Sequence, residues 1–435
     1  MLAESIFEPL RQSIKKCETI RKIGRIQQFF GNTILAKGPD VFLGECCEIY
    51  CGLDSTPVFA EVIGIKEGNV VLMPYDDIEG IRVGSEVIGT GRKLSFEIGD
   101  HLLGSMLDGL GRVQTELKNK SQSQMIEAKS SAISPLERCT KIEPIKTHIP
   151  IFDCLLPIAE GQRIGIFAGS GVGKSTLMLE LINNMQTDIN VVALVGERGR
   201  EVSEFYEQLT KNGNIKNTIV VAATSDAPAL QRVYACLTAT RIAEYYRDKN
   251  KKVGLFVDSM TRYAMALREK NINSGEPPAT RGYTASVFTE IPKLFERAGK
   301  KKNSGSITGI YSVLVEGEDF DEPVSDTMRA TLDGHIVLTR RLANKRLYPS
   351  IDILESRSRL ASKIYTQAEN IVVTKVLNIL SNVEENRQAI ELGIYKTGSN
   401  NQLDNDIKLE KQIIKLLYQN EKKVNLSQLT SLVGR

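Results

Sequence analysis

Short apolar runs separated by turn residues dominate the first part of the chain. The runs VFLGECCEIYCG, VFAEVIGI and NVVLMPY alternate with Gly, Asn and Asp. Strands of this length with frequent turns are typical of a small β-barrel or β-sandwich. We therefore predict an all-β domain over residues 21–90.

The pattern changes from about residue 145. The strand-like runs RIGIFAG, NVVALVGE, TIVVAAT and KVGLFVDSM are separated by stretches long enough to form helices. This alternation predicts a parallel sheet with helices on its faces, and we assign it to residues 146–361. Strand signals fade after Arg359. Residues 362–435 are predicted to form a helical domain, whose clearest amphipathic piece is LEKQIIKLLYQ.

Two further segments flank these domains. Residues 1–20 place apolar side chains at helical spacing and predict a short amphipathic helix. Such a helix docks a partner or packs on its own domain, and the sequence leaves both readings open. Residues 91–145 begin Gly-rich and become polar, which predicts a linker and the entry to the α/β core.

Composition excludes several classes of protein. The 435 residues are 41% hydrophobic and 25% charged, a mix typical of two or three globular domains. The formal net charge of +3 gives no support for a nucleic-acid or membrane-surface role. We see neither a signal peptide nor an apolar run as long as a membrane span, so we expect a cytoplasmic protein.

The seven cysteines do not suggest a disulfide framework, because their number is odd and their spacing irregular. They are Cys17, Cys46, Cys47, Cys51, Cys139, Cys154 and Cys236. Cys46, Cys47 and Cys51 form the only cluster. A zinc site needs four ligands, and no second Cys or His pair follows at a suitable distance. We therefore favour buried strand cysteines over a metal site.

A glycine-rich loop lies between the run RIGIFA and the helical stretch LMLELINNM. This strand–loop–helix context is the one that a phosphate-binding loop requires. Lys174 would reach the β- and γ-phosphates, and Ser175 would offer its hydroxyl to Mg²⁺. The chain has Ala168 where the strict pattern has Gly. The predicted nucleotide-binding residues are Gly169, Ser170, Gly171, Val172, Gly173, Lys174, Ser175 and Thr176.

Two carboxylates follow other predicted strands of the same sheet. Asp258 ends the run KVGLFVD, and Glu197 follows the run NVVALVG. Because parallel strands end at one edge of a sheet, both should lie beside the phosphate loop. Asp258 would hold Mg²⁺ through its water shell. Glu197 fits a group that orients water for attack on the γ-phosphate, although an ordinary surface ion-pair cluster explains its motif equally well.

An arginine-rich motif, Ser356-Arg357-Ser358-Arg359, follows LYPSIDILE. An arginine from outside the phosphate loop can stabilise charge in the transition state and contributes about 10³–10⁵ in rate. The pattern by itself favours a surface arginine.

Taken together, these segments resemble one family. The strings IGIFAGSGVGKSTL, VGERGREVSEF, FVDSMTRYAMALRE and GEPPATRGYTASVFTEIPKLFERAG look like a flagellar or type III secretion export ATPase. So do VEGEDFDEPVSDTMRATLDGHIVLTRRLA and YPSIDILESRSRL. This family is similar to the catalytic β subunit of rotary ATP synthases. The segments LFERAG and YSVLVEGEDFDEP favour an export ATPase over a β subunit of an ATP synthase.

The resemblance carries particular roles. It implies that Glu197 activates water, Arg198 contacts phosphate and Asp258 serves Mg²⁺, with Arg262 nearby. Tyr348, of the YPS motif, would stack on adenine. Arg359 would reach into the site of a neighbouring subunit.

The resemblance also implies an architecture and partners. The fold should be an N-terminal β-barrel, a RecA-like P-loop core with a parallel sheet, and a C-terminal helical domain. A homohexamer is implied because Arg359 completes another subunit's site. The implied partners are a stalk-like regulator, a central coiled-coil stalk protein, an export gate and chaperone–substrate complexes. The resemblance implies a cytoplasmic protein, peripheral at the inner face of the cytoplasmic membrane, that uses ATP and Mg²⁺.

Other functions remain as alternatives. A virulence-type secretion ATPase shares the same motifs, and a rotary ATP synthase catalytic subunit would require a partner α subunit and a shaft. A hexameric RNA translocase would need a basic, aromatic-rich RNA-binding domain, and residues 21–90 are not notably basic, so we expect no nucleic-acid partner. A pure binding module is the remaining alternative, and phosphate release would exclude it.

Overall fold

The computed structural model describes residues 23–50, 56–116, 123–315, 317, 319–320, 322–418 and 424–433. The helix predicted over residues 1–20 lies outside these residues, as do Cys17 and Cys51. Contacts divide the chain into two compact units, the first centred on residues up to 95 and the second on residues 96–435. No helix among the described residues is long and apolar enough to cross a membrane.

The first unit contains a closed six-stranded barrel with the strand order β1-β2-β5-β4-β3-β6. Its strands are β1 (Ile23–Phe30), β2 (Thr33–Lys37), β3 (Cys46–Tyr50), β4 (Val58–Lys66), β5 (Asn69–Pro74) and β6 (Glu86–Gly89). Alternate residues such as Ile34, Ile49 and Leu72 fill the interior. The predicted β-barrel is therefore present.

Cys46 and Cys47 are both buried in barrel strand β3. Burial raises the pKa of each thiol to about 12, with nearby glutamates adding to the effect. Thiols in such surroundings stay protonated and behave as small apolar side chains.

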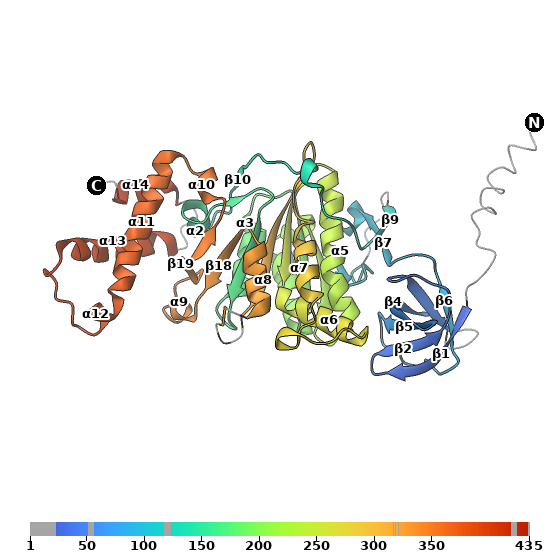
Figure 1. The fold of residues 1–435 in the computed structure, drawn as a ribbon. Helices are drawn as coiled ribbons and strands as arrows, with labels where there is room; N and C mark the ends of the chain where they lie inside the picture. The colour runs from blue at the N-terminus through green and yellow to red at the C-terminus, as the bar shows by residue number, and fades with distance from the viewer. Residues whose placement is uncertain are drawn as a thin grey trace, which may run out of the picture. The chain divides into compact units, whose positions relative to one another are not determined.

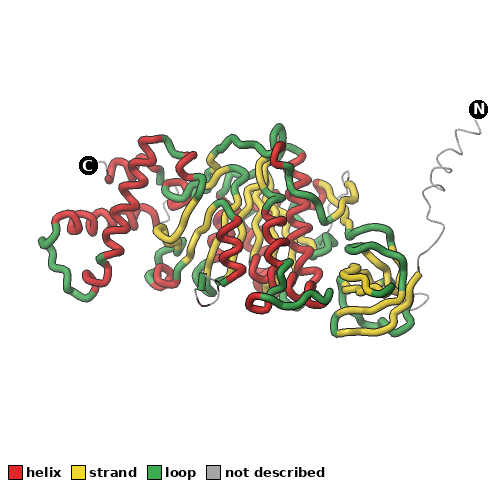
Figure 2. The backbone as a smooth tube through the Cα atoms, viewed as in Figure 1, coloured by secondary structure: helices red, strands yellow, loops and turns green. Residues whose placement is uncertain are grey.

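The second unit is built on a nine-stranded, mainly parallel sheet (Figures 1 and 2). Its path is β19-β18-β12-β17-β15-β13-β14-β8, and β16 pairs with β17. The bounds are β8 (Met106–Asp108), β12 (Arg163–Ala168), β13 (Ile189–Glu197), β14 (Thr218–Thr224), β15 (Lys252–Asp258), β16 (Gly299–Lys300), β17 (Ser306–Leu314), β18 (Gly334–Leu338) and β19 (Ile351–Ser358). β19 is antiparallel to β18, whereas β12 lies parallel to both of its neighbours.

Helices cover both faces of this sheet. Alternate strand residues such as Ile166, Leu194 and Ile336 face a core shared with α3 and α4. The opposite face carries Tyr311, whose ring contacts Phe295 of α7 at 4.6 Å between centroids. The helices around the sheet are α2 (Pro150–Cys154), α3 (Lys174–Asn184), α4 (Gly199–Lys211), α5 (Ala229–Asp248), α6 (Met260–Asn273), α7 (Val287–Phe295), α8 (Pro323–Thr331) and α9 (Arg340–Asn344).

The C-terminal part is helical, as the sequence predicts. It comprises α10 (Ala361–Ile364), α11 (Gln367–Glu385), α12 (Arg387–Glu391), α13 (Asn401–Tyr418) and α14 (Leu426–Val433). The amphipathic piece LEKQIIKLLYQ lies mostly in α13, which packs on α11 and α14. Tyr418 of α13 donates a hydrogen bond to the Ile351 carbonyl at 2.6 Å, which ties this helix to β19.

The segment predicted as a linker does more than connect the two units. Besides β7 (Ser95–Gly99), β9 (Ser123–Glu127), which pairs with β7, and β10 (Pro144–Ile145), which pairs with β11 (Ile158–Ala159), it contributes β8 to the edge of the central sheet. At Gly109 a Cβ atom would lie 2.1 Å from the Gln231 carbonyl oxygen of α5. The glycines that suggested a flexible linker include one that permits close packing on a helix.

Candidate active site

The phosphate loop connects β12 to α3 at the carboxyl edge of the sheet. Gly171 and Gly173 adopt φ values of 78° and 93°, in the left-handed region that glycine occupies without strain. Gly173 is the N-cap residue of α3, which begins at Lys174. Backbone N–H groups and the positive end of the helix dipole therefore converge here, as anion binding requires. Gly171, Ser175 and Thr176 are exposed.

Lys174 and Asp258 are in direct contact. The Lys174 Nζ lies 2.5 Å from Asp258 Oδ1, and the two side chains are 13% and 4% exposed. The Ser312 hydroxyl of β17 donates to the same carboxylate oxygen at 2.6 Å. The ends of β12, β15 and β17 thus bring an ammonium, a carboxylate and a hydroxyl together, because all three strands run in one direction.

Glu197 lies beside this pair at the end of β13. One of its oxygens is 3.8 Å from Lys174 Nζ, and the other is 2.8 Å from Arg262 Nη1. Arg262 also donates to the Gly196 carbonyl. The structure thus brings together Lys174, Asp258 and Glu197, which the sequence predicts for one site. It places Arg262 against Glu197.

Glu197 titrates unlike an ordinary glutamate. Burial raises its pKa to about 7, and a hydrogen bond with Glu201 and the charge of Asp258 act in the same direction. Lys174 and Arg262 oppose the rise. The hydrogen bond with Glu197 in turn lowers the pKa of Glu201. A carboxyl group with a pKa near 7 is suited to accept a proton from water at neutral pH.

Tyr348 lies beside the phosphate loop. It precedes β19, and a Cβ atom placed on Gly173 would be 3.5 Å from its ring. The ring is half exposed, with 48% of the residue accessible. Ser350 holds the loop that carries Tyr348, because its buried hydroxyl donates to the Val172 carbonyl at 2.6 Å. An exposed aromatic face beside a phosphate loop can stack on a purine.

Two predicted residues do not join this cluster. The Arg198 side chain is 81% exposed, and its nearest carboxylate is Glu201 at 3.9 Å. Arg359 follows the last residue of β19, a strand that spans roughly 25 Å at about 3.3 Å per residue. Because β19 runs antiparallel to β18, Arg359 lies at the amino edge of the parallel strands, far from its own phosphate loop.

Three residues of the site were missed by sequence reasoning. Glu201 lies in the first turn of α4, four residues after Glu197 at the end of β13. Ser312 and Ser350 are polar residues in buried positions. A hydroxyl inside an otherwise apolar strand is the signal that could have identified Ser312.

Oxygen ligands for a divalent cation are present. The Ser175 hydroxyl is exposed at the start of α3, and Asp258 presents a carboxylate that is already oriented by Ser312. Such hydroxyl and carboxylate donors fit Mg²⁺, which prefers oxygen ligands and retains several waters. Fold and site together define a P-loop nucleotide-binding protein.

Comparison with known proteins specifies the family. The family model for the nucleotide-binding domain of the ATP synthase alpha/beta family matches residues 148–358, and its β-barrel domain matches residues 26–91. The model for the T3SS EscN ATPase C-terminal domain matches residues 366–431.

Individual relatives agree with these matches. The chain is 42% identical to the flagellum-specific ATP synthase of Bacillus subtilis, over 98% of this chain and 99% of the relative. It is 38% identical to the type 3 secretion system ATPase of Xanthomonas euvesicatoria, over 92% and 90%. The solved structure of the assembled ATPase EscN from the enteropathogenic E. coli type III secretion system superposes with a TM-score of 0.87 at 37% identity, covering 94% of this chain and 99% of EscN. The chain belongs to the family of flagellum-specific and type III secretion ATPases.

Proposed function

We propose that this ATPase forms a homohexameric ring that hydrolyses Mg-ATP to power the export of flagellar proteins. The observation that carries the catalytic part is the cluster of Lys174, Asp258 and Glu197 at the phosphate loop. Flagellum-specific relatives in Bacillus subtilis, Borreliella burgdorferi and Treponema pallidum, at 40–42% identity, favour the flagellar role. A virulence-type secretion role is the alternative, favoured by the 38% identity to the Xanthomonas protein.

In the proposed reaction, water attacks the γ-phosphorus directly, the bond from this phosphorus to the β–γ bridging oxygen breaks, and ADP and inorganic phosphate leave. The phosphate loop, residues 168–176, orients the triphosphate, and Lys174 exchanges its contact with Asp258 for one with the β- and γ-phosphates. Glu197 positions the attacking water and accepts its proton. Mg²⁺, held by Ser175 and, through water, by Asp258, would supply charge neutralisation at the phosphates. Arg198 is exposed, so its proposed phosphate contact requires its side chain to turn toward the site.

The experiment that tests this function uses the purified full-length chain. We expect Mg-ATP-dependent phosphate release that nucleic acid does not stimulate, and ring-sized particles by native mass spectrometry when a non-hydrolysable ATP analogue is present. Flagellar subunits and their chaperones should co-purify from the source cells. Recovery of virulence effectors instead would favour the alternative role, and absence of phosphate release would refute the enzyme.

Arg359 should act on the nucleotide of a neighbouring protomer. Its place at the amino edge of the sheet supports this proposal, since its own phosphate loop lies at the other edge. Arg359→Ala should keep ATP binding and lose about 10³-fold in turnover. Mixing it with Lys174→Ala protomers should restore part of the activity, because some interfaces then pair an intact loop with an intact arginine. Failure of every mixing ratio to restore activity would contradict a role in trans.

Tyr348 is proposed to stack on adenine. Base–aromatic stacking contributes about 1–3 kcal/mol, so Tyr348→Ala should raise KM for ATP about tenfold or more with little change in kcat. Tyr348→Phe is the matched control and should behave as wild type. An unchanged KM in Tyr348→Ala would remove this assignment.

Further partners are proposed from the relationship to a solved complex. A structure of EscN in complex with its central stalk EscO superposes on this chain with a TM-score of 0.84 at 37% identity. We propose an equivalent coiled-coil stalk here, together with a stalk-like regulator, an export gate and chaperone–substrate complexes. The proposed location is cytoplasmic, with peripheral association at the inner face of the membrane. A pull-down with the purified ring that recovers no coiled-coil protein would count against the stalk.

A further inference from the structure

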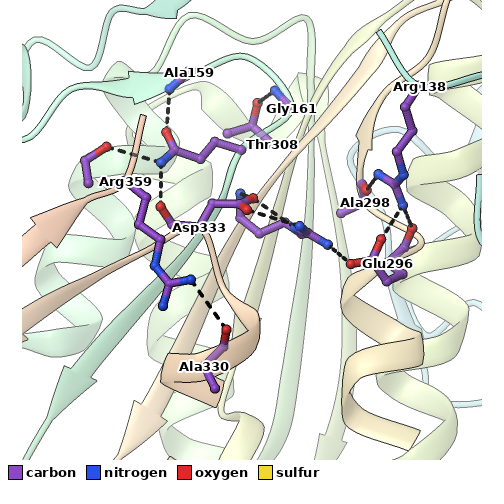
Figure 3. A network of polar contacts seen from close by, with 12 residues as sticks. Arg138, Ala159, Gly161, Glu296, Ala298, Thr308, Ala330, Asp333 and Arg359 are labelled. Carbon is purple, nitrogen blue, oxygen red and sulfur yellow. Dashed lines mark hydrogen bonds and ion pairs between the residues drawn. The ribbon is translucent and has the colours of Figure 1, made fainter. Parts of the chain in front are cut away.

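A row of four side chains with alternating charge lies on the face of the sheet that α7 and α8 cover (Figure 3). Its members are Arg138, Glu296, Arg163 and Asp333. Arg138 pairs with Glu296 at 2.7 Å, and Glu296 also pairs with Arg163. Arg163 then binds Asp333 through two contacts, Nε to Oδ2 at 2.9 Å and Nη2 to Oδ1 at 3.1 Å. This row of charges therefore ends on the Asp333 carboxylate, and both of its oxygens accept hydrogen bonds from Arg163.

The backbone of Asp333 is fixed between two strands. Its N–H donates to the Arg163 carbonyl at 2.9 Å. Its own carbonyl accepts from the Arg359 N–H at 3.0 Å and from the Gln162 side-chain amide at 3.1 Å. Gln162 is buried at 1% exposure and also donates to the Ser358 hydroxyl at 3.2 Å. The Asp333 carboxylate, by contrast, is held among the described residues only by Arg163, through its guanidinium and through its backbone N–H, which donates to Oδ2 at 3.1 Å.

The Arg359 side chain contacts no carboxylate among the described residues. Its guanidinium donates to the carbonyls of Arg329 at 2.9 Å and Ala330 at 3.5 Å, near the end of α8. Carbonyls at a helix C-terminus attract a cation but bind it less firmly than a carboxylate does. The side chain is largely exposed. Arg359 is thus held loosely and remains accessible.

Asp333 is nevertheless the neighbour of Arg359. Gly334 pairs with Ser358 in the antiparallel register, and the hydrogen bond from Arg359 to Asp333 continues it by one residue. Residues opposite one another in such a pair have Cβ atoms about 5 Å apart on the same face of the sheet. A rotation of the Asp333 side chain would therefore bring its carboxylate to the Arg359 guanidinium.

We propose that Arg163 is a positioning residue that holds the Asp333 carboxylate away from Arg359, so that Arg359 stays available to a nucleotide bound by the next protomer. This inference rests on the proposed trans role of Arg359. Arg163 is suited to the task because its side chain is only 15% exposed and its planar guanidinium binds the carboxylate in a bidentate manner. Without the guanidinium, Asp333 would keep a single hydrogen bond from the backbone N–H of residue 163, and its carboxylate would pair with the Arg359 guanidinium of its own chain.

The test is a set of variants assayed for turnover by the assembled enzyme and for ATP binding. Arg163→Ala should lower turnover by about tenfold or more, because the arginine finger contributes about 10³–10⁵ in rate. ATP binding should be unchanged. The double variant Arg163→Ala/Asp333→Asn should recover most of the lost turnover, because the amide cannot hold Arg359 as an ion pair. Recovery on removal of a second charge is a result that a purely structural role of Arg163 does not produce.

Two controls complete the set. Arg138→Ala removes the other arginine from Glu296 but leaves the contact between Arg163 and Asp333, so turnover should stay near wild type. Asp333→Asn alone should also keep its turnover, and it tests the inference if Arg163→Ala does not fold. A double variant as inactive as Arg163→Ala, an inactive Asp333→Asn, or an equal loss in Arg138→Ala would each overturn the inference.

Failure of the underlying function gives a different pattern. If Arg359→Ala retains full turnover, the trans role itself is wrong. If Arg359→Ala is impaired while Arg163→Ala is fully active, only the positioning role of Arg163 is wrong.

Discussion

Replacing Lys174 by alanine should abolish ATP hydrolysis and weaken nucleotide binding. The ammonium is the cation that contacts Asp258 at the phosphate loop, whereas the neighbouring Arg262 is held by Glu197 and the Gly196 carbonyl. Loss of a preorganised group that stabilises transition-state charge costs about 3–4 kcal/mol, or 10²–10³ in rate. Loss of nucleotide affinity adds to this. Phosphate release by the purified variant measures the effect.

The control for Lys174→Ala is Lys211→Ala. Lys211 lies on α4 with its side chain 72% exposed and forms only a surface pair with Glu207. Such pairs contribute little, so this variant should match wild type in stability and turnover. Thermal unfolding of both variants distinguishes a catalytic loss from misfolding. Normal turnover in a folded Lys174→Ala protein would refute the assigned phosphate loop.

Glu197→Gln should bind ATP but hydrolyse it about 10²–10⁴ times more slowly, the usual contribution of a positioned base. Glutamine keeps the shape of the side chain and can still accept a hydrogen bond from Arg262. It cannot accept a proton from water. Single-turnover hydrolysis, measured beside equilibrium binding of ATP, separates the two effects. Unchanged turnover would remove Glu197 as the group that activates water.

The pH dependence of wild-type kcat/KM provides a second measurement of this role. The base works when it is deprotonated, and its pKa in the free enzyme is raised to about 7. The rate should therefore increase as pH rises through about 7 and level off above it. Glu201→Gln should move this limb to lower pH, because the hydrogen bond with Glu201 is one cause of the raised pKa. A limb that stays in place in Glu201→Gln would contradict the proton-sharing pair.

The local parts of the site could be predicted from sequence because short motifs encode them. The phosphate loop occupies consecutive residues between a strand and a helix, so its geometry follows from its own glycines. Asp258 and Glu197 each end an apolar run, and the parallel direction of the strands brings them together at one edge. Patterning alone was enough to place both carboxylates at this edge, whereas the role of Glu197 was left open by its motif and came from the family resemblance.

Other parts depend on long-range packing that patterning does not reveal. The antiparallel direction of β19 places Tyr348 and Arg359 at opposite edges of the sheet, and before the structure only the family resemblance pointed to their separate roles. β8 is three residues long, lies before a Gly-rich turn, and pairs with a strand more than a hundred residues away, so it was read as part of a linker. Asp333 and Arg163 meet across strands β18 and β12, a contact that no local motif announces.

The most direct test of the central claim is equilibrium binding of Mg-ATP to the purified wild-type chain, followed by phosphate release from the same complex. We predict saturable binding of one nucleotide per chain, lost in Lys174→Ala, and phosphate release that is lost in Glu197→Gln while binding remains. A wild-type protein that binds no Mg-ATP, or binds it equally well without Lys174, would contradict the account.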